Sequence, residues 1–422
     1  MKVVKGFELG KSVLSRRGDL TEGQEDQEAV VRDILSEVRK RGDAALYAFT
    51  EKFDGVKLNT LEVTKAAITA AYQQVDSEVV SSLKIAAERI QAYHLNQKTS
   101  LVHDSIKGGM GWVMRPLNRI GIHIPGFTAA LPSSVLMTVI PAKVAGVSEI
   151  IVATPHRKAG GVSPLTLVAC DIAGANRVFS IGGAQAIAAM AFGTQTVPAV
   201  DKVCGPGNIF ATLAKKLLFG IVGIDALQGP SEVLIIADHT VDPEYCAADF
   251  LAQAEHPAGY PVLVTTSMEL ADKLVQVIER QLKELPHPEI AAQSIEKNGV
   301  VAIVETVNEA VELANIYAPE HLLLLVDKAN TYLDLIRNAG CVVLGKKGTV
   351  AVGDYAAGPS HVLPTGGTAR FASPLNVLEF MKLTSIIQVD DNTLKKIGPV
   401  VKTLAKAEGL DAHAKAVDRR LG

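Results

Sequence analysis

The chain has 422 residues, 48% of them hydrophobic and 21% charged, which is typical of a globular protein with a large core. At roughly 100–200 residues per domain, this length predicts two or three domains. The net charge of −3 leaves no basic field and argues against nucleic acid as a partner. The four cysteines form no C-x-x-C pair, which excludes a zinc ribbon or thioredoxin-type motif and favours reduced thiols in a cytoplasmic protein. No apolar run of signal-peptide or membrane-span length occurs, so no membrane association is expected.

The first quarter of the chain reads as helical. Residues 1–20 are expected to form an arm with little core-forming power. Residues 24–41 place their apolar side chains at helical spacing and end at Gly42, which predicts a helix with a glycine stop. Residues 64–97 predict further helix.

From about residue 115 the pattern alternates between short apolar runs and helical segments such as 164–175 and 242–256. The runs are nearly continuously apolar, as expected for strands that are covered on both faces. Such alternation predicts parallel, doubly wound α/β sheets, and eight strands are enough for two units. After about residue 375 the chain becomes polar and helical, which predicts a C-terminal appendage. The predicted strands are 149–155, 177–183, 201–207, 231–238, 261–267, 299–304, 321–327 and 340–345.

Three glycine-rich turns point to a ligand crevice, although no G-x-G-x-x-G follows a predicted strand. In 180–193 a strand ends at two glycines and a helix follows at once, with Gln185 in its first turn. Residues 203–210 repeat this arrangement and carry Asn208, and 120–134 contains a third such turn. Glycines permit tight turns, and free N–H groups at helix starts attract anions. The alternative for each turn is plain strand-to-helix packing.

The stretch FLAQAEHPAG places Gln253 and His256 three residues apart on the helix predicted for 242–256. They lie about 60° apart around the axis and share one face, whereas Glu255 points elsewhere. The pair is a candidate metal site. A histidine at a helix end can equally serve as a C-terminal cap.

Two further segments combine carboxylates with histidines. Glu320 and His321 adjoin in APEHL and can divide acid–base work, although they precede their strand, at the opposite end from the usual ligand crevice. The glycine-rich residues 353–367 carry Asp354 and His361, which suit a hard or borderline cation, or they form a turn-rich connector. The polar tail holds Glu408 and His413, which pattern alone does not single out.

Taken together, these segments resemble the histidinol dehydrogenase family in order along nearly the whole chain. The matching motifs are LPSSVLM (131–137), GGAQAIAA (182–189), GPGN (205–208), VGIDALQGPSEVLIIAD (222–238), QAEH (253–256), APEHL (318–322), GDYAAGPSHVLPT (353–365) and EGLDAH (408–413).

The resemblance implies oxidation of L-histidinol to L-histidine through L-histidinal, the last steps of histidine biosynthesis, with NAD and one zinc ion per subunit. Glu320 and His321 would be the acid–base pair, and the NAD site would include His123, Gln185 and Asn208. The implied zinc ligands, which would also contact substrate, are Gln253, His256, Asp354 and His413. The other implied substrate contacts are Ser231, His321, His361 and Glu408.

The resemblance also implies an intertwined homodimer of two incomplete Rossmann-like domains, in which the C-terminal segment reaches the partner's site. On this basis we expect an N-terminal arm (1–20), a discontinuous first domain that carries zinc and catalytic residues (21–115 and 232–374), a second domain on the NAD side (116–231) and a helical dimerisation segment (375–422).

The sequence departs from the family pattern at three positions. His123 stands where a tyrosine usually contacts the cofactor, Phe127 replaces a glycine of the same turn, and Gln228 replaces a small residue. These changes bear on NAD binding more than on metal binding. Three alternatives stay open: oxidation of another amino alcohol or diol, a zinc-binding paralogue without redox activity, and a zinc hydrolase.

Overall fold

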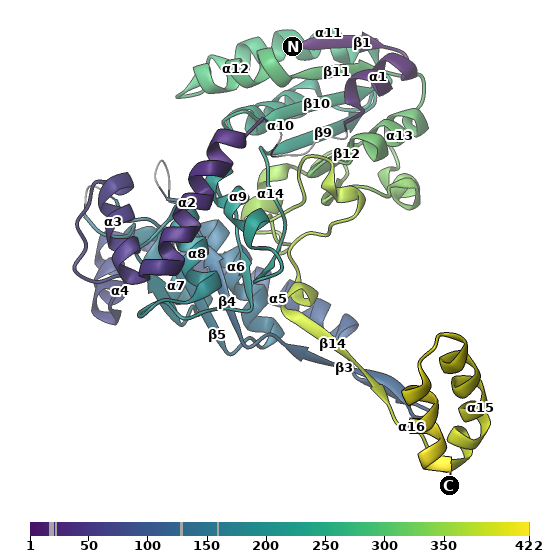
Figure 1. Cartoon of the computed structure of the whole chain (residues 1–422). Coiled ribbons are helices and arrows are strands. Elements are labelled where there is room, and N and C mark those ends of the chain that lie inside the picture. Colours follow the sequence, from purple (N-terminus) through teal and green to yellow (C-terminus); the bar gives the residue numbers. More distant parts are fainter. Residues whose placement is uncertain (17–20, 22, 127–129, 158–159, 422) are drawn as a thin grey trace.

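A computed structural model describes residues 1–16, 21, 23–126, 130–157 and 160–421, and it contains two parallel sheets and one antiparallel ribbon (Figure 1). All eight strands predicted from the apolar runs are present, and the parallel α/β class is confirmed. Phe127 lies outside the described residues. Within the described residues, no helix combines the length and the apolar character needed to cross a membrane.

The larger sheet has six parallel strands in the order β1-β11-β10-β9-β12-β13. One face is covered by α10, α11 and α12, and the other by α1 and α13. The strands are β1 (Lys2–Lys5), β9 (Glu232–Ala237), β10 (Tyr260–Thr265), β11 (Val300–Ile303), β12 (His321–Leu325) and β13 (Cys341–Leu344). The helices are α1 (Phe7–Leu14), α10 (Pro243–Ala254), α11 (Met268–Leu282), α12 (Pro288–Asn298) and α13 (Val307–Tyr317).

The smaller parallel sheet has five strands in the order β6-β5-β4-β7-β8. Helices α5, α6 and α7 pack on one face, and α2, α3, α8 and α9 belong to the other. The strands are β4 (Arg119–His123), β5 (Glu149–Ala153), β6 (Arg177–Phe179), β7 (Lys202–Cys204) and β8 (Gly223–Ile224). The helices are α2 (Glu25–Arg41), α3 (Asp43–Asp54), α4 (Lys65–Ala71), α5 (Ser77–Leu101), α6 (Pro132–Ala145), α7 (Pro164–Ala173), α8 (Gly183–Phe192) and α9 (Ile209–Leu218).

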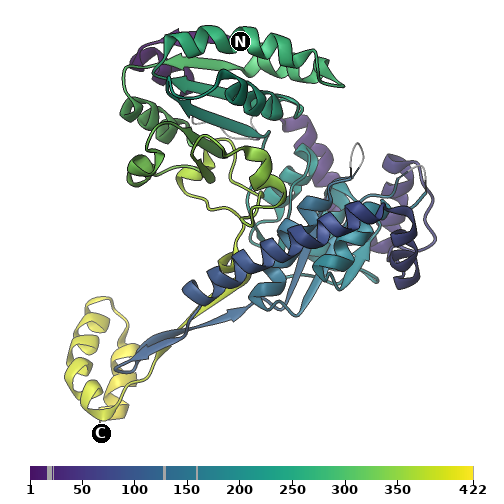
Figure 2. The same cartoon turned by 180° about the vertical axis from the view of Figure 1, so that it is seen from behind.

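A long ribbon carries the C-terminus away from both sheets (Figures 1 and 2). It is the antiparallel sheet β14-β3-β2, and α15 and α16 pack against each other at its far end. Its strands are β2 (Ser105–Lys107), β3 (Met110–Pro116) and β14 (Met381–Ile387), and its helices are α15 (Asp391–Ala407) and α16 (Asp411–Leu421). The remaining helices are α14 (Val350–Tyr355) and the short 3-10 segments η1 (Tyr72–Gln74), η2 (Ala329–Leu335), η3 (Thr368–Arg370) and η4 (Val377–Phe380).

The fold corrects three of the expected boundaries. The expected arm does contribute to a core over its described residues 1–16, because β1 pairs with β11 and Leu14 is buried against the six-stranded sheet. Residues 21–115 do not join the unit formed by 232–374, because α2 to α5 pack on the five-stranded unit. The segment 375–422 is not wholly helical, since β14 pairs with β3. Each of these errors concerns a packing partner that is distant in sequence.

Asp54, at the end of α3, is a buried carboxyl group whose oxygens have no hydrogen-bond partner among the described residues. Burial raises its pKa from 3.8 to about 6. The folded state therefore holds this proton more tightly than the unfolded chain, and the stability that this gives is lost as the pH rises from 3.8 to about 6.

We expect Asp54→Asn to raise the free energy of unfolding at pH 8 by roughly 1–2 kcal/mol, because a buried neutral amide costs less than a buried charge. The gain should shrink below pH 5. Urea unfolding at pH 8 and pH 4.5 measures both values, with the exposed Asp33→Asn as the matched control. An equal gain at both pH values would contradict a charge penalty at Asp54.

Candidate active site

A cavity of about 250 Å³ lies between the two parallel-sheet units and is lined by residues from both. The five-stranded unit contributes Pro206, just after β7, and the start of α6. The six-stranded unit contributes residues that precede β9 and β12. The structure thus brings together seven of the predicted site residues: Ser231, Gln253, His256, Glu320, His321, Asp354 and His361.

The cavity explains why Glu320 and His321 precede their strand. The carboxyl edge of the five-stranded sheet supplies its turns to the same cavity that receives the amino-terminal ends of β9 and β12. The carboxyl edge of the five-stranded sheet, where parallel sheets usually bind ligands, therefore faces the amino edge of the six-stranded sheet. This meeting of two edges does not follow from the strand pattern alone.

Glu320 is held by the backbone of the neighbouring strand. The left-handed Ala318 (φ 53°) ends α13, and the chain then turns into β12. The Glu320 carboxylate is 7% exposed, and its Oε2 accepts the Glu232 backbone N–H at 2.8 Å. Burial raises the pKa of Glu320 well above its ordinary range, and the bond from Glu232 opposes that shift. The geometry suits a carboxylate that exchanges protons inside the cavity.

His321 is 5% exposed and stands beside Asp354, with 3.6 Å between Nε2 and Oδ1. Its Nδ1 is buried and has no hydrogen-bond partner among the described residues. Burial, assisted by the nearby His361 and His256, lowers the pKa of His321 to about 3. The imidazole is therefore neutral at physiological pH, which is the form that accepts a proton.

His361 is fixed by bonds to both ring nitrogens. Nδ1–H donates to the Asp354 carbonyl at 2.8 Å, so Nε2 accepts the Ser134 hydroxyl at 3.2 Å. Burial lowers the pKa of His361 to about 4. Ser134 was not among the predicted site residues, because a serine in the first turn of a helix reads as an ordinary polar residue.

Gln253, His256 and Asp354 converge from two segments of the six-stranded unit. Gln253 is 3% exposed, and its amide nitrogen has no hydrogen-bond partner among the described residues. His256 is exposed just beyond the end of α10, and burial raises the pKa of Asp354 to about 7. Glu255 is exposed and does not line the cavity. The helix predicted for 242–256 ends earlier, at Ala254, so His256 lies beyond it and the expected shared helix face does not apply to this residue.

Glu408 and His413 do not join this cluster within one chain. Glu408 is the residue after α15 and His413 lies on α16, both at the far end of the ribbon (Figure 1). Neither residue lines the cavity. Across the described part of a single chain, no group of three or more His, Cys, Asp or Glu side chains is arranged to hold a metal ion.

The three residues predicted for the cofactor side stand at the carboxyl edge of the five-stranded sheet. His123 ends β4, Gln185 lies in the first turn of α8, and Asn208 caps α9 by accepting the Ala211 N–H at 3.2 Å. Gln185 is 3% exposed, whereas Asn208 is exposed. The predicted glycine turns thus follow the ends of β4, β6 and β7.

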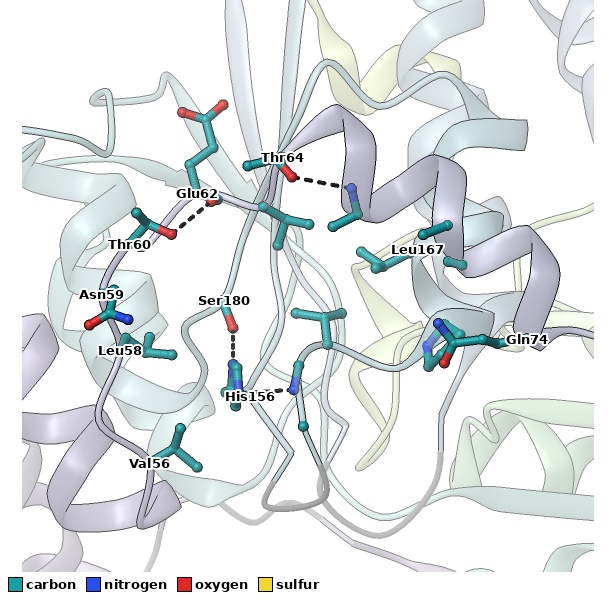
Figure 3. Close-up of a pocket in the computed structure, with 18 of the residues that line it drawn as sticks. Val56, Leu58, Asn59, Thr60, Glu62, Thr64, Gln74, His156, Leu167 and Ser180 are labelled. Atoms are coloured by element: carbon teal, nitrogen blue, oxygen red, sulfur yellow. Dashed lines mark hydrogen bonds between the residues drawn. The ribbon is translucent and has the colours of Figure 1, made fainter.

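A larger cavity, of about 510 Å³, lies at the same edge beside β5 and β6 (Figure 3). None of the predicted site residues lines it. His156, which does, accepts the Gly161 N–H on Nε2 at 2.9 Å, so its Nδ1–H donates to the Ser180 hydroxyl at 2.9 Å. The Nδ1 proton leaves His156 unable to act as a base toward Ser180, which excludes a nucleophile–base pair here.

Arg16 and Glu232 hold the segments that carry the site residues, and neither of them was nominated from the sequence. The Arg16 guanidinium forms a two-bond ion pair with Glu232 and stacks 3.6 Å from the Tyr317 ring centroid. Glu232 also accepts the Gly366 N–H at 2.8 Å, which links the end of the glycine-rich residues 353–367 to β9. A carboxylate at the start of the apolar run 231–238 was the available signal for Glu232. Arg16 carried no such signal, because it follows a helix in a polar stretch of the sequence where an arginine is unremarkable.

Comparison with known proteins shows the family of the chain. The family model described as histidinol dehydrogenase matches residues 19–421. The histidinol dehydrogenase of Dehalococcoides mccartyi strain CBDB1 is 48% identical over 100% of both chains, and that of Deinococcus radiodurans is 48% identical over 93% of this chain and 91% of the relative. The crystal structure of histidinol dehydrogenase from Elizabethkingia anophelis superposes with a TM-score of 0.94 at 36% identity, covering 100% of this chain and 98% of that one. The chain therefore belongs to the histidinol dehydrogenase family of oxidoreductases.

Proposed function

We propose that the chain oxidises L-histidinol to L-histidine through L-histidinal, with two successive hydride transfers to NAD and one zinc ion per subunit. The observation that carries this proposal is the single cavity that gathers Glu320 and His321 with Gln253, His256 and Asp354. This one small cavity thus holds an acid–base pair together with nitrogen and oxygen donors. It lies at the carboxyl edge of the five-stranded sheet, the edge at which parallel sheets usually bind nucleotides.

The proton steps follow from the two buried bases. In the first oxidation, His321 would accept the hydroxyl proton of histidinol, and the carbon that carries this hydroxyl would lose hydride to NAD. In the second, Glu320 would take a proton from water as the water adds to the aldehyde, and the resulting hydrate anion would give its hydride to a second NAD. The two steps need two bases that reach the same carbon, which accounts for the adjacency of Glu320 and His321.

The residues present fit a zinc ion. The Gln253 carboxamide can offer its oxygen, and His256 and Asp354 line the same cavity with a nitrogen and an oxygen ligand. We assign the fourth position to His413 from a second copy of the chain. When bound, zinc would hold the imidazole and amine of the substrate in a fixed pose and bias their protonation.

The remaining contacts are assigned by their place around the cavity. Ser231 and His361 line it and would face substrate together with His321, while Glu408 would enter with the partner's tail. We place NAD along the carboxyl edge of the five-stranded sheet, with Gln185 and Asn208 on the cofactor side.

A homodimer supplies the missing residues. The α15–α16 pair lies away from both sheets (Figure 2), and its exposed side chains include Val400, Leu404 and Leu410. Apolar side chains on a projecting helix pair are what a partner subunit would cover. The same association would bring Glu408 and His413 to the second copy's cavity.

The direct test is oxidation of L-histidinol at alkaline pH by zinc-loaded protein. We expect two NADH per histidinol consumed, loss of activity after chelation, and recovery when zinc returns. A panel of other amino alcohols and diols tests specificity. The absence of NADH with zinc-loaded, folded protein would refute the proposal, and tight zinc without NAD binding by calorimetry would favour a redox-inactive paralogue.

A further inference from the structure

His123 stands between two of the glycine turns at the carboxyl edge of the five-stranded sheet. Its ring is 3% exposed and lies at the end of β4, the central strand. One ring nitrogen, Nδ1, lies 2.8 Å from the Pro206 carbonyl oxygen in the turn after β7. The other, Nε2, lies 3.2 Å from the Gly183 amide nitrogen in the turn after β6.

These two bonds define the state of the imidazole. The Gly183 N–H can only donate, so Nε2 carries no proton and accepts this hydrogen bond. The Pro206 carbonyl can only accept, so Nδ1 carries the proton. Burial lowers the pKa of His123 to about 4, so this neutral tautomer persists through the physiological pH range.

The turn that contains Pro206 is fitted closely against His123. A Cβ on Gly205 would lie 2.3 Å from the His123 carbonyl oxygen, and Gly205 has a φ of +106°. On the other side, Asp225 accepts the Gly205 N–H at 2.7 Å and Lys215 donates to the Gly205 carbonyl at 3.1 Å. Asp225 and Lys215 thus hold the Pro206 turn in place, and His123 connects it to the Gly183 turn.

We propose that His123 is a positioning residue that fixes the spacing between the Gly183 and Pro206 turns and thereby sets the affinity for NAD. The inference rests on the proposed function, because it takes NAD to lie at this sheet edge. With both ring nitrogens used inside the protein, the effect on the cofactor is transmitted through the turns instead of through a polar contact. The turns lead into Gln185 and Asn208, the residues assigned to the cofactor side.

His123→Phe tests the inference because it keeps a ring of similar size and removes both bonds. We expect the Kd for NAD to rise about tenfold or more, while zinc content changes less than twofold. His94→Phe is the matched control, since His94 is also buried in the same unit but its Nδ1 contacts Gln97 of its own helix α5 instead of a glycine turn. An unchanged Kd for NAD in His123→Phe would overturn the inference.

Two partial variants and a second measurement separate this inference from the proposed function. His123→Asn retains a donor near the Nδ1 position and His123→Gln an acceptor near the Nε2 position, so each should recover part of the NAD affinity. Hydrogen–deuterium exchange of residues 180–186 and 203–210 reports the turns without any cofactor, and it should quicken in His123→Phe but not in His94→Phe. If wild-type protein fails to bind NAD but exchange still quickens, the proposed function fails and the link between turns stands. Unchanged exchange would refute the link itself.

Discussion

Glu320→Gln is expected to abolish the oxidation of L-histidinal while it spares much of the first hydride transfer. Glutamine keeps the size of the side chain and can still accept the Glu232 N–H, but it cannot take a proton from water. General-base catalysis contributes roughly 10²–10⁴-fold, so oxidation of added L-histidinal should fall by at least about a hundredfold. Single-turnover NADH formation from histidinol and from histidinal measures the two steps separately.

The matched control is Glu255→Gln. Glu255 is a carboxylate two residues from Gln253, yet it is exposed and does not line the cavity. We expect this variant to keep its zinc and both oxidation steps. Histidinal oxidation within tenfold of wild type in Glu320→Gln would remove Glu320 from the role of base.

His413→Ala is expected to lose zinc and activity although each subunit keeps its folded sheets. His413 lies on α16 at the far end of the ribbon, remote from the cores of both sheets, so its removal leaves those cores intact. Loss of one ligand from a four-coordinate site strongly weakens the binding of the metal ion. Metal analysis and circular dichroism measure the two properties, with the nearby Lys415→Ala as control. Full zinc content in His413→Ala would contradict the ligand assignment.

Mixing two inactive variants tests whether the site is shared. When His413→Ala and Glu320→Gln chains exchange subunits, a mixed dimer has one cavity with an intact Glu320 and an intact tail. Random exchange should therefore restore about a quarter of wild-type histidinol oxidation, since half of the dimers are mixed and half of their sites are complete. No recovery, with exchange verified by a tag on one chain, would refute the shared site.

Local pattern was sufficient for eight of the strands and for part of the site. Continuous apolar runs located all eight predicted strands, because strands covered on both faces need apolar side chains at every position. The cavity contains Gln253 and His256 and not Glu255. The helical spacing used to predict this does not apply to His256, because α10 ends at Ala254. Asp242 caps α10 by accepting the Glu244 N–H.

Tertiary packing decided the rest. The sequence of α2 shows an apolar face but not which sheet it covers, and the expected grouping of 21–115 with 232–374 was wrong for that reason. The arm residue Arg16 became part of the site's support only through a contact with Glu232, 216 residues away. His123 was predicted as a cofactor contact, and its two internal bonds depend on turns from two other strands.

By itself, the sequence determined the α/β class, eight of the strands and the family, because periodicity and local motifs are properties of neighbouring residues. Only the tertiary structure decided that the carboxyl edge of one sheet meets the amino edge of the other around Glu320 and His321. It also decided that Glu408 and His413 lie far from that cavity in their own chain. The physical reason is that these placements depend on which buried faces fit together, and such complementarity involves residues hundreds of positions apart.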